Sequence, residues 1–164
     1  MALHNDLTPQ NIKAKLNIPP NLKNAFDRVT TAGMKVLYDP STQSEVKGHL
    51  AGQGDMGTKL GQGISIVMLH MFKQSNGTIP PNVMPPAGIY LIVEFADFLE
   101  KSGKYQISDA DIGTAIQVLI QALMKAFNIN KDNVSQLASQ MPGQATAAGQ
   151  PSPAGGIIQS AQGV

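Results

Sequence analysis

The sequence has no cysteine, no tryptophan, a single arginine and few charged residues of either sign. Without cysteine, disulfides, thiolate zinc sites, iron–sulfur clusters and cysteine nucleophiles are excluded. Charged residues make up 14% of the chain, against about 25% in typical soluble domains, and the formal net charge is +1. Arg28 stands alone and the lysines are spread along the chain. Because phosphate binding needs clustered basic residues, we expect no sequence-specific nucleic-acid partner.

The common catalytic and metal-binding motifs are also missing. The histidines His4, His49 and His70 are far apart, and none has a partner at metal-ligand spacing. No Gly-x-Ser-x-Gly nucleophile motif occurs. The N-terminal segment has no basic region followed by an apolar run, which predicts no signal peptide. We therefore expect no catalytic residue, no metal site and no cofactor, and we interpret the chain as a non-enzyme.

Apolar residues at helical spacing occupy most of the chain, separated by proline and glycine pairs. The spacing predicts an all-α bundle of five to seven helices and no sheet, with helices over residues 9–16, 20–38, 40–50, 59–75, 85–102, 109–127 and 132–141. The residues expected in the core are Phe26, Val29, Val67, Met68, Leu91, Phe95, Ile116, Leu119 and Ile120. His70, between Leu69 and Met71, is expected at a helix interface.

Polar residues stand where helix ends are expected. Thr8, Asp39 and Thr58 are predicted N-caps, and Ser108 with Asp111 three residues later resembles a capping box. Gly103 follows a predicted helix at the position that favours glycine.

A compositional change divides the chain near residue 141. Residues 1–141 are the predicted helical domain, whereas residues 142–164 have no charged side chain and consist mainly of Gly, Ala, Pro, Gln and Ser. Such a segment buries too little apolar area to order itself, so we expect a low-complexity tail that engages a neighbouring subunit or is disordered. Ile157 and Ile158 form its only apolar pair able to anchor it and are the predicted partner-binding residues.

Two motifs have a functional and a simpler interpretation. Residues 52–57, GQGDMG, match the G-x-G-x-x-G dinucleotide fingerprint and continue into Thr58 and Lys59, the reverse of the order that a phosphate-binding loop requires. No strand precedes them, so we interpret the segment as a hinge or a close helix contact. Glu94, Asp97 and Glu100 form an acidic line, which a small enzyme with a pocket at Glu94 and Asp97 could use. The simpler interpretation is the solvated face of a helix.

Three segments are more apolar than surface helices usually are: residues 60–72, 88–93 and 112–124. Each is shorter than the roughly 20 apolar residues that cross a bilayer. We therefore expect each to be central in the bundle or covered by a partner. Interfacial insertion, or a pore built from several subunits, is the membrane alternative.

The helical body, the stretches 88–105 and 107–129, and the tail rich in Gln, Ala and Gly together resemble small virion proteins of tailed bacteriophages, including internal proteins ejected with the genome. The resemblance covers residues 20–130 in style and brings no functional residue with it. It implies a structural subunit near the portal or tail, present as a homo-oligomer among other virion proteins. The implied location is the virion, or the host envelope after ejection, where a channel-forming oligomer is the alternative.

Overall fold

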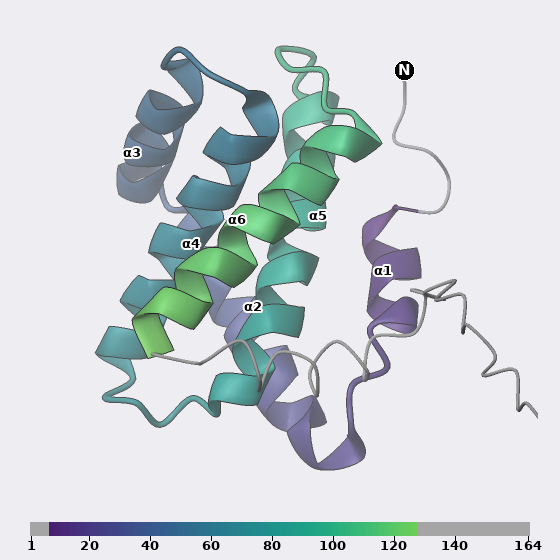
Figure 1. The fold of residues 1–164 in the computed structure, drawn as a ribbon, viewed down its shortest axis with the longest axis vertical. Helices are drawn as coiled ribbons and strands as arrows, with labels where there is room; N and C mark the ends of the chain where they lie inside the picture. The colour runs from purple at the N-terminus through teal and green to yellow at the C-terminus, as the bar shows by residue number, and fades with distance from the viewer. Residues whose placement is uncertain (1–6, 128–164) are drawn as a thin grey trace, which may run out of the picture.

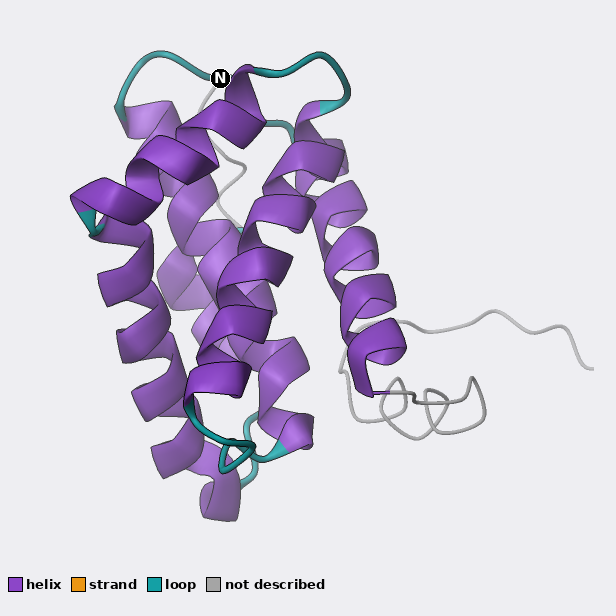
Figure 2. Cartoon of the chain, turned by 90° about the vertical axis from the view of Figure 1, so that its left-hand side faces the viewer, coloured by secondary structure: helices purple, strands orange, loops and turns teal. Residues whose placement is uncertain are grey.

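The computed structural model describes residues 7–127, and all regular structure in this range is helical, which confirms the predicted all-α fold there. The elements are α1 (Pro9–Lys15), η1 (Pro20–Leu22), α2 (Lys23–Tyr38), α3 (Pro40–Ala51), α4 (Met56–Gln74), η2 (Pro81–Val83), α5 (Met84–Lys101) and α6 (Asp109–Phe127). Figure 2 shows these helices joined by loops, with no strand among the described residues. The predicted helix 132–141, the tail 142–164 and the pair Ile157 and Ile158 lie outside this range.

Local hydrogen bonds explain where several helices begin. The Thr8 hydroxyl accepts from the Asn11 amide at 3.3 Å, and the Asp39 carboxylate accepts from the Ser41 amide at 2.9 Å. Asp111 accepts from the Ser108 amide at 2.8 Å and in turn donates its own amide to the Ser108 hydroxyl at 3.2 Å, a reciprocal capping box. These N-caps are confirmed.

The predicted N-cap of α4 is wrong, because the helix begins three residues earlier than expected. Asp55, not Thr58, is the cap: its carboxylate accepts from the Thr58 amide at 2.8 Å and from the Thr58 hydroxyl at 3.0 Å. A carboxylate also interacts favourably with the positive end of the helix dipole, which a threonine hydroxyl does not.

Helices α4 and α5 lie between α2 on one side and α6 on the other. Figure 1 shows α6 crossing in front of both, with α3 beside α4 and α1 beside α5. The core fills the space between these helices, and its largest fully buried side chains include Phe26, Leu60, Met68, Leu91 and Leu119. Apolar residues therefore occupy both faces of α5, which explains why the segment 88–93 is apolar all round.

Helices α4 and α6 run parallel and approach each other closely. A Cβ atom added to Gly57 would lie 2.5 Å from the carbonyl oxygen of Asp111. At the other end, the rings of Phe72 and Phe127 pack edge to face with centroids 4.6 Å apart. The start of α4 thus contacts the start of α6, and the end of α4 contacts the end of α6. Gly57 makes the close helix contact that was expected of the 52–57 segment.

Seven of the nine predicted core residues are buried, but Ile116 and Ile120 are only half-buried. In α6 the buried positions are instead Ile112, Ala115, Leu119 and Leu123. The small Ala115 faces inward because it packs on Gly61 of α4. Because of this contact, the face of α6 that points into the core differs from the predicted one. Ile116 and Ile120 lie at the edge of the buried face.

Candidate interaction surface

The 52–57 segment is organised as a helix junction rather than a phosphate site. The Asp55 carboxylate occupies the amino end of α4, where a phosphate would have to bind. The ammonium group of Lys59 donates to the carbonyl oxygens of Leu50, at 3.2 Å, and Gly52, at the carboxyl end of α3. Lys59, the lysine of the phosphate-loop-like sequence, therefore joins the start of α4 to the end of α3 by hydrogen bonds.

The acidic line on α5 is made of half-buried carboxylates, each with a nearby donor. Glu94 accepts from the Tyr90 hydroxyl, Asp97 pairs with Lys101 at 2.6 Å, and Glu100 accepts from the Ile107 amide at 3.4 Å. The first two contacts lie within α5, and the third joins α5 to the loop that precedes α6. Among residues 7–127, no group of three or more acidic or histidine side chains is placed to hold a metal ion.

Two tyrosines beside this acidic line, Tyr38 and Tyr90, have raised pKa values. Burial raises the pKa of the Tyr90 hydroxyl, and its hydrogen bond to Glu94 raises it further. Burial likewise raises the pKa of Tyr38, with the negative charges of Glu94 and Asp97 adding to the effect. In both cases the environment favours the neutral phenol over the phenolate.

The two described histidines lie on the surface. His70 is exposed and forms a hydrogen bond of 2.8 Å with the Gln74 side chain, one turn further along α4. Its predicted place at a helix interface is therefore wrong for this fold. His49 is exposed near the end of α3, and His4 lies outside the described residues.

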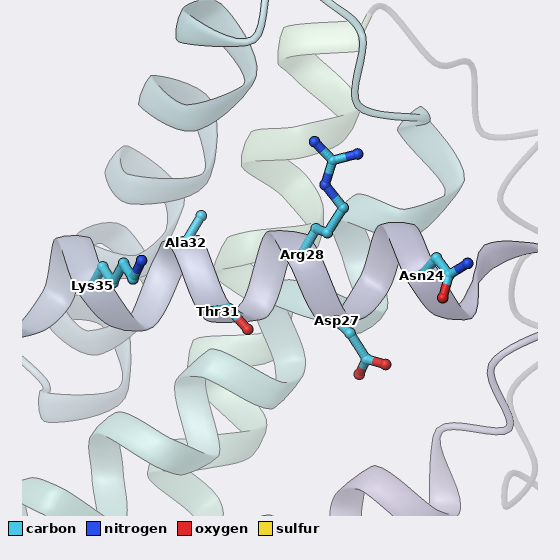
Figure 3. A pocket seen from close by; sticks show the side chains of 6 residues that line it. All are labelled: Asn24, Asp27, Arg28, Thr31, Ala32 and Lys35. Atoms are coloured by element: carbon cyan, nitrogen blue, oxygen red, sulfur yellow. The ribbon is translucent and has the colours of Figure 1, made fainter.

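The exposed side of α2 has an open depression lined by Asn24, Asp27, Arg28, Thr31, Ala32 and Lys35. Figure 3 shows that all six side chains come from this single helix and project in different directions. The Asp27 carboxylate is engaged by Lys13 of α1 at 3.1 Å. The depression is thus the charged outer surface of one helix and not an enclosed pocket.

An apolar groove of about 360 Å³ lies where α3, α4 and α6 meet. Its lining residues are His49, Gln62, Ser65, Ile66, Leu69, Val118 and Ala122. Ile66 is 43% exposed, and it is the one exposed large apolar side chain among the described residues. The groove has no acidic, lysine or arginine side chain in its lining.

We define the outer face of α6 as the exposed residues Gly113, Gln117 and Gln121 together with Ile116, Ile120 and Met124 along its edge. Gly113, Gln117 and Gln121 are exposed, and the other three are half-buried. No charged residue occurs in α6 between Asp111 and Lys125. The main contacts of α6 within the described residues are with α4 and α5, on its opposite side.

Among residues 7–127, α6 is the one helix long and apolar enough to cross a membrane on length and composition alone. The apolar segment 112–124 was expected to be too short to cross a bilayer, and it forms the middle of this helix, which extends from Asp109 to Phe127 as predicted. Its large apolar side chains are all buried or half-buried within the described bundle, and its exposed residues are Gly, Ala, Gln, Asp and Lys.

Sequence analysis did not identify the groove, because its residues come from three helices. The one available signal was the apolar segment 112–124, which was expected to be either central or covered by a partner. Comparisons with protein-family models, with curated proteins and with solved structures found no match to this chain.

Proposed function

We propose that this chain is a non-enzymatic structural subunit that acts in several copies within a larger protein assembly. The observation that supports the proposal is α6, whose side chains Ile116, Ile120 and Met124 are only half-buried and which has no charged residue between Asp111 and Lys125. Apolar side chains that remain partly accessible at the surface of the described bundle are available for contact with a partner, and apolar surface commonly marks interaction sites. The groove beside α6 adds apolar surface from α4, including Ile66.

The more specific form of the proposal is a multi-copy virion protein of a tailed bacteriophage, located near the portal or tail or ejected with the genome. It rests on the resemblance of residues 88–105 and 107–129, and of the tail, to such proteins. Its partners would be further copies of itself and other virion proteins. The low charge of the chain agrees with a subunit whose surface is largely covered by neighbours.

The experiment for the general proposal is a mass measurement of the full chain in solution, by light scattering or sedimentation over a wide concentration range. We expect species at multiples of 17.3 kDa. A species that remains at the mass of one chain at all concentrations, and that binds no larger protein, contradicts the proposal. The virion form is tested by mass spectrometry and imaging of purified particles that contain the chain.

A second candidate function, a membrane-interacting helical oligomer, is favoured by the length and composition of α6. If α6 meets lipid, the full chain should associate with anionic vesicles and release a trapped dye at micromolar concentration. Replacing Ile120 by lysine should abolish the leakage, whereas the matched Ala32→Lys variant on exposed α2 should retain it. Absence of vesicle binding by the unmodified chain would exclude this candidate.

A further inference from the structure

We propose that the neutral surface formed by Ile66 and the outer face of α6 is the interface at which two copies of this chain pair about a two-fold axis. This inference rests on the proposed multi-copy function and assigns it a place on the fold. The surface lies on the side of the bundle where α6 crosses α4 and α5, as Figure 1 shows.

The distribution of charge favours a second copy as the occupant. Across a two-fold axis the same patch faces itself, so a charged residue near the axis meets its own like charge. The outer face of α6 meets this requirement, because it has no charged side chain between Asp111 and Lys125. The exposed side of α2, in contrast, carries Asp27, Arg28 and Lys35. The neutral face is therefore the one suited to self-pairing.

The polar groups of the surface are complementary to themselves. A glutamine amide carries both donors and acceptors, so the same side chain from two copies can form hydrogen bonds with each other. Gln117 and Gln121 are exposed along the middle of the outer face, and Gln62 lies in the groove lining. In lipid these amides would be buried without partners, which is costly, whereas a second copy supplies both donors and acceptors.

Gly113 is a further feature of this face that favours the close approach of a second helix. It is an exposed glycine within α6, and nothing lies within 4 Å of the position that its Cβ atom would occupy. Glycine weakens a helix relative to alanine, and no contact within the described fold requires it here. The bare backbone leaves room for a second helix to approach α6 closely at this point.

Single-cysteine variants test the interface cleanly because the chain contains no cysteine of its own. We would oxidise full-length Gln117→Cys and Gln121→Cys variants and examine them by non-reducing electrophoresis. At least one should form a covalent dimer in high yield. Thr31→Cys, at an exposed position on α2, is the matched control and should remain monomeric under the same conditions.

A charge-exchange experiment provides the second measurement. Full-length Gln117→Lys and Gln117→Glu variants should each associate about tenfold or more weakly than the unmodified chain, because like charges meet at the axis. An equimolar mixture of the two should regain association through opposite charges. The control Thr31→Lys should associate as the unmodified chain does, and circular dichroism should show the same helix content for all variants.

The outcomes separate this inference from the proposed function. Oligomers that form normally in both Gln117 charge variants, without cross-linking at positions 117 and 121, would overturn this interface and leave the multi-copy function standing. A chain that is monomeric throughout would overturn both. Thiol protection of Gln117→Cys without dimers would instead show that another segment of the same chain covers the face, and protection that needs vesicles would show a lipid contact. Either result would overturn the inference.

Discussion

Gly61 of α4 and Ala115 of α6 bring the backbones of two helices into direct contact. A Cβ atom added to Gly61 would lie 2.6 Å from the Ala115 carbonyl oxygen and 2.9 Å from its Cα atom. Backbone atoms cannot rotate away as a side chain can, so the helices would have to move apart. This pair sets the rotation of α6, and with it the residues that α6 presents on its outer face.

The first prediction is that Gly61→Ala destabilises the fold although alanine is the better helix former. Overpacking costs typically about 1–3 kcal/mol, which exceeds the gain of about 1 kcal/mol in helix propensity. Gly48→Ala is the matched control, because nothing lies within 4 Å of its added Cβ atom, and it should stabilise the protein. Urea unfolding measures both, and equal stabilisation by the two variants would contradict the close contact.

The second prediction concerns the core around α5. Phe95 is 4% exposed and stacks on Phe98 with ring centroids 6.2 Å apart. Phe95→Ala should lower the free energy of unfolding by about 3–5 kcal/mol through lost burial and a residual cavity. Ile66→Ala, at an exposed position, should cost less than about 1 kcal/mol in the monomer. A similarly small cost for Phe95→Ala would show that this face of α5 is not core.

The third prediction is a loss of stability in acid that comes from two helix caps. Hydrogen bonds from Ser41 hold the pKa of Asp39 below its ordinary value of 3.8, and those from Ser108 do the same for Asp111, with the Gly57 amide contributing less. Because both folded-state values lie below the unfolded value, their contribution is present above pH 3.8 and is lost as the pH falls through the folded values.

The measurement is the thermal midpoint of unfolding between about pH 5 and pH 2. Asn in place of both Asp39 and Asp111 keeps an acceptor at each cap but removes the titrating group, so the doubly substituted protein should lose less stability over this range. An identical acid dependence in the two proteins would show that other groups are responsible.

The fourth prediction concerns the tail, which lies outside the described residues. Deleting residues 142–164 should leave the helical circular dichroism and thermal midpoint nearly unchanged, because the segment has no charged side chain and little apolar area to contribute. Assembly or partner binding should be impaired, with Ile157 and Ile158 as the anchoring pair. Unfolding on deletion would place the tail in the core, and intact assembly would make it a passive extension.

The sequence by itself determined the helices and most of their ends, because these depend on residues close together in the chain. Thr8, Asp39 and Ser108 cap the helices as predicted, and Gly103 follows α5 with a φ of 70°, the conformation that glycine adopts most easily. The apolar spacing also identified the central core residues, including Met68 and Leu91.

Only the tertiary structure decided which side of α6 faces inward. Ile116 and Ile120 fit the apolar periodicity as well as the residues that are buried, but Ala115 packs on Gly61, a residue 54 positions earlier in the sequence. The same packing brings Ile66 of α4 beside Val118 and Ala122 of α6 in one groove. Periodicity within a helix reports how apolar residues are spaced, whereas the choice among similar faces depends on the shape of the neighbouring helix, which local sequence does not encode.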